Sequence, residues 1–146
     1  MPQSGSAPVT KAQSVRMLKH ELRTPVNYIM GYSELLLEAA DKAGEAELTK
    51  VVTTIYANGR VLCELLDKKL SKSSDGIDIS QCNALGNTLH PAIRQIVKAA
   101  SLASRIQISE AFAADLGRIR QAVYRLTTSP ELGMTQLTPQ ETSDFL

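Results

Sequence analysis

A histidine and a glutamate, followed one turn later by a proline, form the part of this sequence whose residue types and spacing indicate chemistry. The residues are His20, Glu21 and Pro25, in the run LKHELRTPVNYIMGYSELL. Apolar residues recur around them at spacings of three and four, which predicts a helix. On a heptad with Leu22 and Ile29 at position a, His20 falls at position f, far from the apolar seam. We therefore expect an outward-facing imidazole next to a carboxylate.

Pro25 is an unfavourable residue for the middle of that helix. It has no N–H to donate to the carbonyl of Glu21, four residues earlier. A proline inside a helix costs roughly 3 kcal/mol. We expect the helix to be weakened and bent beside His20. A proline kept next to an outward His–Glu pair indicates function rather than packing.

Four apolar stripes of this kind predict the helices that position these residues. The predicted helices cover about 12–40, 48–66, 79–104 and 109–128. Gly44 is the expected stop of the first helix, Ser109 the expected N-cap of the last, and Pro130 the residue that closes it.

Composition agrees with an all-α fold. Of the 146 residues 43% are hydrophobic but only 4% aromatic, and Ala, Leu, Glu, Lys, Gln and Arg, all good helix formers, are abundant. With 16 Lys+Arg against 15 Asp+Glu the net charge is +1, which argues against a nucleic-acid binder. No apolar run could span a membrane and the N-terminus lacks a signal-peptide core, so we expect a cytoplasmic protein. Cys63 and Cys82 are interpreted as ordinary reduced thiols.

The two halves of the chain carry matching stripes. A shift of 67 places Leu18 on Leu85, Leu22 on Leu89, Val26 on Ile93 and Ile29 on Ile96. A shift of 64 places Leu48 on Phe112, Val52 on Leu116 and Ile55 on Ile119. This repeat predicts a four-helix antiparallel bundle made of two helical hairpins.

The predicted organisation follows from the repeat. A flexible arm (1–12) precedes one hairpin (13–72) and a second hairpin (73–129), and a tail or linker (130–146) follows. Because the second hairpin can cover the apolar seam of the first, we favour a monomer over a homodimer.

The run from His20 to Pro25, with Asn27 and the later Gly-Tyr-Ser-Glu at 31–34, resembles the H-box of sensor histidine kinases. That family's dimerisation and histidine-phosphotransfer domain is a helical hairpin, so the chain would be a pseudo-dimer of it. The resemblance covers about residues 13–72. It implies that His20 accepts a phosphoryl group, that Glu21 orients the imidazole and takes up its proton, and that Thr24 positions a water for dephosphorylating a receiver domain.

The same resemblance assigns three further residues. Arg23, Asn27 and Gly31 would contact the visiting partner, although a solvated helix face explains Arg23 and Asn27 equally well. Pro25 keeps a structural role.

Two departures from the family pattern change the expected activity. Residues 73–146 show neither strand alternation nor a glycine-rich phosphate loop, so we expect no ATP-binding kinase domain in this chain. ATP and Mg²⁺ would be held by a separate kinase or receiver domain, in cis beyond the chain or in trans, and this chain would bind no metal or cofactor itself. The second departure is that the shift of 67 places His20 on Asn87 and Thr24 on Pro91. His90 is interpreted as an ordinary helix residue.

The sequence thus favours a phosphotransfer module of a two-component or phosphorelay system, with one active histidine and a degenerate second hairpin. The partners would be a response-regulator receiver domain and an ATP-binding kinase domain. The alternative is a non-catalytic helical scaffold that dimerises or docks a response regulator.

Overall fold

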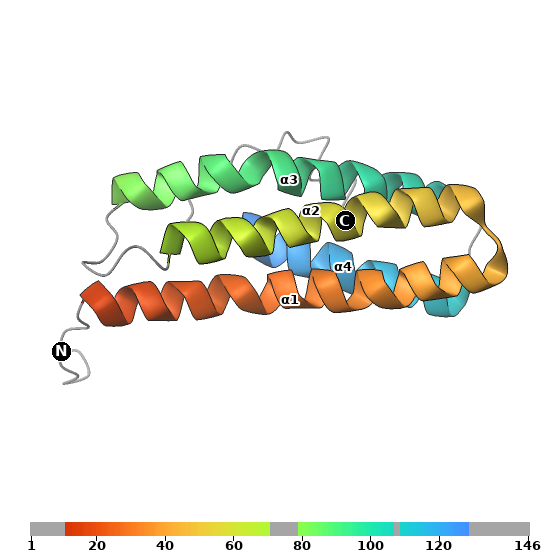
Figure 1. Cartoon of the computed structure of the whole chain (residues 1–146), viewed down its shortest axis with the longest axis horizontal. Coiled ribbons are helices and arrows are strands. Elements are labelled where there is room, and N and C mark those ends of the chain that lie inside the picture. Colours follow the sequence, from red (N-terminus) through yellow and green to blue (C-terminus); the bar gives the residue numbers. More distant parts are fainter. Residues whose placement is uncertain (1–10, 71–78, 107–108, 129–146) are drawn as a thin grey trace.

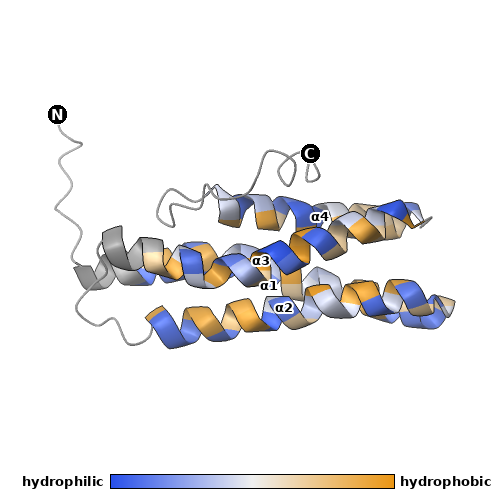
Figure 2. Ribbon diagram, turned by 90° about the horizontal axis from the view of Figure 1, so that it is seen from above, coloured by the Kyte–Doolittle hydropathy of each residue, from blue (hydrophilic) through white to orange (hydrophobic). Residues whose placement is uncertain are grey.

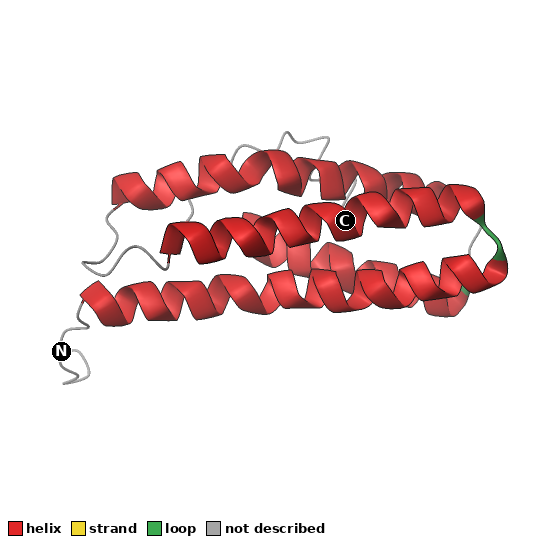
Figure 3. Ribbon diagram, in the orientation of Figure 1, coloured by secondary structure: helices red, strands yellow, loops and turns green. Residues whose placement is uncertain are grey.

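Four long helices lie side by side along one axis of the molecule (Figures 1 and 3). The structure is a computed structural model that describes residues 11–70, 79–106 and 109–128, and side chains at all of these except 11–15 and 79–83. The helices are α1 (Lys11–Ala43), α2 (Ala46–Leu70), α3 (Ile79–Arg105) and α4 (Glu110–Thr127). Within these ranges no strand is present, so the predicted all-α four-helix bundle is confirmed.

The helix ends show the expected local chemistry. Gly44 adopts a left-handed backbone with φ of 69°, which turns the chain between α1 and α2. Ser109 is the N-cap of α4, and its hydroxyl accepts a hydrogen bond from the N–H of Phe112. α1 continues through Pro25 as one helix, and α3 continues through Pro91. The predicted tail (130–146), Pro130 and most of the arm (1–12) lie outside the described residues.

The apolar stripes meet in one core along the length of the bundle. Val26, Ile55, Leu89 and Ile119, one from each helix, are fully buried. Hydrophilic residues occupy the outer sides of the helices in the view from above (Figure 2). Burial of all four stripes against one another, rather than helix propensity alone, stabilises helices of this length.

Each helix packs against two others in a ring. α1 contacts α2 and α4 extensively, and α2 contacts α1 and α3 extensively, whereas the contact between α3 and α4 is much smaller. The two hairpins therefore pack on each other more closely than the second hairpin packs on itself. No helix in the described part of the chain is long and apolar enough to cross a membrane.

Candidate functional site

The side chains of His20 and Glu21 point outward from the first half of α1. Both residues are exposed, as their positions opposite the apolar seam predict. Within the residues that the structure describes, neither side chain makes a hydrogen bond or an ion pair. The imidazole of His20 is thus accessible to a partner that brings a phosphorus atom to it.

Thr24 lies one turn after His20 and is tied to it through the backbone. Its Oγ1 donates a hydrogen bond to the carbonyl oxygen of His20, at 3.1 Å. Pro25 follows with its ring buried, on the side of α1 that faces the bundle. Because Pro25 has no N–H, the carbonyl of Glu21 loses its usual helical partner. The adjacent carbonyls of His20 and Glu21 therefore differ: the Thr24 hydroxyl bonds the first, and the second lacks the N–H donor four residues later.

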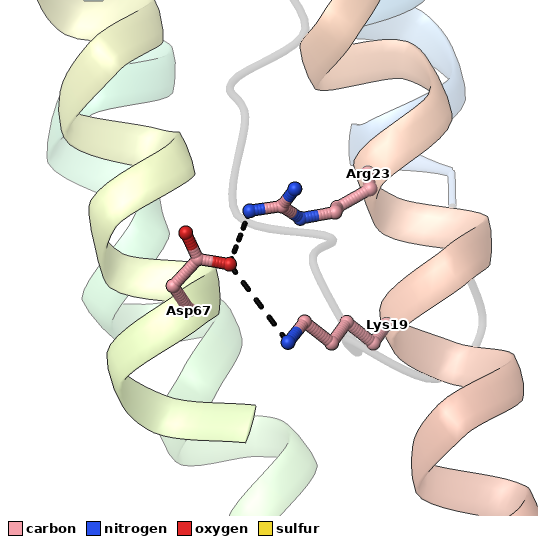
Figure 4. Close-up of polar contacts among 3 residues, drawn as sticks. All are labelled: Lys19, Arg23 and Asp67. Carbon is pink, nitrogen blue, oxygen red and sulfur yellow. Dashed lines mark hydrogen bonds and ion pairs between the residues drawn. The ribbon is translucent and has the colours of Figure 1, made fainter. Parts of the chain in front are cut away.

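Arg23 does not extend freely from the surface. Its Nη2 donates to Oδ1 of Asp67 on α2, and Lys19 Nζ lies 3.8 Å from the same oxygen (Figure 4). The Nε of Arg23 is buried and has no hydrogen-bond partner among the described residues. One guanidinium thus joins α1 to α2 at the level of His20, a contact within the chain where the sequence suggested a partner contact.

The remaining two candidates for partner contact are open. Asn27 and Gly31 are exposed on α1. A Cβ added at Gly31 would meet nothing within 4 Å, so no close packing requires glycine there. Both positions share the outward face of α1 with His20 and Thr24, since residues three and four apart are neighbours on a helix.

Asp67 is the site residue that sequence reasoning missed. A signal was available in the sequence, because Lys19 and Arg23 stand one turn apart near the start of one helix. In an antiparallel hairpin the end of the second helix lies opposite the start of the first, and Asp67 is an acid near that end. What the sequence lacks is the rotation of the two helices about their axes, which decides whether these side chains face each other.

Cys63 lies one turn before Asp67 on the same helix. Burial raises the pKa of its thiol above the ordinary value, Arg23 lowers that pKa and Asp67 raises it further. The pKa of this thiol therefore depends on the charges of both Arg23 and Asp67. Cys82 lies outside the residues whose side chains are described.

A second contact joins α1 to α4 on the other flank of α1. The guanidinium carbon of Arg118 lies 5.5 Å from the ring centroid of Tyr32, a cation–π distance. The rings of Tyr28 and Tyr32 have centroids 6.2 Å apart. This flank is aromatic, whereas the flank towards α2 carries ion pairs.

The described residues of the second hairpin offer no equivalent of this site. Asn87, at the position matching His20, is exposed. His90 is half-buried, and its Nε2 is buried without a hydrogen-bond partner in the described part of the chain. No group of His, Cys, Asp or Glu that could hold a metal ion occurs among the described residues.

Comparison with known proteins identifies the first hairpin. The family model of the His Kinase A (phospho-acceptor) domain matches residues 10–76, which include all of α1 and α2. No curated protein and no solved structure matches the chain significantly. The matched segment contains the outward imidazole of His20 and ends before α3. Residues 10–76 therefore belong to the His Kinase A (phospho-acceptor) domain family, the phospho-accepting module of histidine kinases in two-component signalling.

Proposed function

We propose that His20 is the phosphoryl carrier of this chain and that a receiver-domain aspartate is its acceptor. The observation that carries the proposal is the exposed imidazole of His20, beside Glu21, inside a phospho-acceptor domain. A nucleophile that is accessible and oriented is what phosphoryl transfer requires from this side of the reaction.

The proposed chemistry has two steps. A ring nitrogen of His20 attacks the γ-phosphorus of ATP held by a separate kinase domain, the bond from phosphorus to the leaving ADP oxygen breaks, and Glu21 takes the proton from the other ring nitrogen. In the second step a carboxylate oxygen of the receiver attacks phosphorus, and the P–N bond breaks. The imidazole leaves as a good leaving group once its other nitrogen regains a proton.

Thr24 is proposed to act after transfer, by positioning a water molecule against the aspartyl phosphate of the receiver. Its hydroxyl donates to the carbonyl of His20, and the lone pairs of the same oxygen can accept a hydrogen bond from that water. We propose that the module acts as a monomer, because α3 and α4 cover the apolar seam of the first hairpin. We further propose the cytoplasm as its compartment, since ATP and receiver domains are found there.

Phosphorylation by labelled phosphoramidate tests the acceptor role. Wild-type protein is expected to gain acid-labile phosphate, and His20→Gln none, with unchanged helical circular dichroism because residue 20 is exposed. Glu21→Gln is expected to accept phosphate about 10²-fold more slowly or worse, because it removes the proton acceptor. Phosphate on histidine in the His20→Gln protein would show that the acceptor is elsewhere. A folded wild type that never accepts phosphate, from phosphoramidate or from a kinase domain, would favour the docking scaffold.

Thr24→Ala separates the proposed dephosphorylation role from acceptance. We expect this variant to accept phosphate at the wild-type rate and to pass it on, but to dephosphorylate the receiver more slowly. Asn27→Ala, on the same face, is the matched control for loss of partner contact. Equal rates of receiver dephosphorylation in the Thr24→Ala and wild-type proteins would exclude the role.

A further inference from the structure

Two cations share one carboxylate at the level of His20. Oδ1 of Asp67 accepts from Arg23 and lies 3.8 Å from Lys19 Nζ (Figure 4). Lys19 directly precedes His20, and Arg23 follows it by three residues. Two charges of +1 and one of −1 leave this cluster with a net formal charge of +1 beside the proposed acceptor.

The donors of Arg23 are not all in use. Asp67 holds Nη2, whereas the buried Nε has no hydrogen-bond partner among the described residues. A guanidinium has five N–H donors and binds phosphate oxygens through two parallel hydrogen bonds. Arg23 is therefore held by one carboxylate oxygen although it has the donor geometry for a stronger anion.

Phosphorylation would bring that stronger anion within reach. Residues at i and i+3 on a helix are neighbours, with about 5–6 Å between their Cβ atoms, so Arg23 reaches over His20 by rotation of its side chain. A phosphoryl group adds about two negative charges and three acceptor oxygens, against one charge on Asp67. Lys19 lies one position from His20 and about 100° away around the helix, further towards α2. It is therefore the better placed of the two cations to stay with Asp67.

We propose that phosphorylation of His20 transfers Arg23 from Asp67 to the phosphoryl group and leaves Asp67 to Lys19. The inference rests on the proposed acceptor role of His20 and goes beyond it. Arg23 is then a positioning residue for the phosphoryl group, and the Arg23–Asp67 pair is a latch between α1 and α2 that opens when the site is loaded. A docking partner would meet a different α1–α2 surface before and after phosphorylation.

The Nε–H signal of Arg23 in nitrogen-15 NMR spectra tests the exchange of partners. Arg23→Gln assigns the signal by removing it. In the unphosphorylated protein, Asp67→Asn should shift the signal because it removes the partner of the guanidinium. After treatment with phosphoramidate the wild-type signal should move. The wild-type and Asp67→Asn signals should then coincide, because Asp67 is no longer the partner. An equal effect of Asp67→Asn in both states would overturn the latch.

The energetic coupling between Arg23 and Asp67, measured by urea unfolding at pH 8.5, tests the exchange of partners independently. A double-mutant cycle of Arg23→Gln with Asp67→Asn should show about two- to five-fold coupling in the unfolding constant, the range of a partly exposed pair. We expect this coupling to vanish in the phosphorylated protein. The matched cycle of Lys19→Gln with Asp67→Asn should keep its coupling in both states. Loss of both couplings together would mean general loosening and contradict an exchange of partners.

Intact mass measured on the same samples separates the two claims. Absence of phosphate would overturn the acceptor role and the latch with it. Phosphate on His20 with an unchanged Arg23–Asp67 coupling would overturn the latch alone and leave the acceptor role standing.

Discussion

The two hairpins share an apolar stripe but differ in how their own helices meet. α1 and α2 contact each other extensively and are tied by Arg23 and Asp67, whereas α3 and α4 make the smallest of the four neighbouring contacts. The hairpin that carries the exposed imidazole of His20 is thus also the one whose two helices pack closely and are joined by an ion pair. The second hairpin serves mainly as a cover, with α3 on α2 and α4 on α1.

Two features explain the difference. Gly59 allows α1 to approach α2, because an added Cβ would lie 2.9 Å from Sδ of Met30 and 3.2 Å from Cγ2 of Ile29. The matching position in α4 is Val123, whose side chain must be accommodated. α4 is also shorter, with 18 residues against 25 in α2, and ends before a position matching Asp67. The first hairpin therefore has close helix packing and the Arg23–Asp67 ion pair, whereas the described helices of the second hairpin contact each other less.

The largest effect should come from breaking the core equally in both hairpins. Ile55→Ala in α2 and Ile119→Ala in α4 each remove a fully buried side chain, and each should cost about 2–5 kcal/mol of unfolding free energy. Urea unfolding followed by circular dichroism measures this. Equal losses of unfolding free energy in one cooperative transition would show that the second hairpin shares one core with the first. A negligible cost for Ile119→Ala, or unfolding in two steps, would contradict a single bundle.

The close approach at Gly59 should be specific to the first hairpin. Gly59→Val should destabilise the protein by about 1–3 kcal/mol, because the side chain collides with Met30 and Ile29. Gly117→Val in α4 is the matched control, since a Cβ there meets nothing within 4 Å and valine is the better helix former. The melting temperatures should therefore change in opposite directions. A similar loss in both variants would show that close helix approach is not confined to α1 and α2.

The ion-pair tie should be weak in the unphosphorylated protein. Asp67→Asn should cost under about 1 kcal/mol, because its side chain is 52% exposed, and the cost should fall at high salt. Glu38→Gln removes the exposed pair of Glu38 with Lys42 within α1 and serves as the control for a tie that joins no second helix. If the effect of Asp67→Asn on unfolding did not depend on salt, the tie would not be electrostatic.

The smallest effect should be on the reactivity of the Cys63 thiol, which lies one turn before Asp67 on α2. Burial raises the pKa of its thiol, and the thiolate is the reactive form, so alkylation should require a higher pH than for an exposed thiol. Asp67→Asn should move the pH profile of alkylation down, because it removes a negative charge that disfavours the thiolate. Arg23→Gln should move the profile up. Peptide mass spectrometry reads Cys63 separately from Cys82, and shifts of the opposite sign would rule out this arrangement of charges.

Much of the fold follows from spacing alone. Apolar residues three and four apart predicted all four helices, and the structure extends the first three of them only slightly. Ser109 and Gly44 were predictable because a hydroxyl before a helix and a glycine after one satisfy unpaired backbone groups. The outward position of His20 followed in the same way, since the stripe fixes the opposite face.

The contacts between helices were not predictable in this way. The pairing of Arg23 with Asp67, and of Arg118 with the Tyr32 ring, depends on the register and rotation of two helices, which a stripe defines only to within a turn. The loose contact of α3 with α4 depends on side-chain volume at Val123 and on where α4 ends. Arg23 shows the consequence, because an exposed face predicted a partner contact and the structure places an intramolecular ion pair there.

The phosphate count on the intact chain tests the central claim, that one hairpin of two carries the chemistry. Wild-type protein and His90→Gln should each gain one acid-labile phosphate from phosphoramidate, and His20→Gln should gain none, by intact mass under alkaline conditions. We expect His90 to remain unphosphorylated, because its Nε2 is buried and no acid adjoins it. Two phosphates on the wild type, or one that persists in His20→Gln and disappears in His90→Gln, would show that the second hairpin also accepts phosphate.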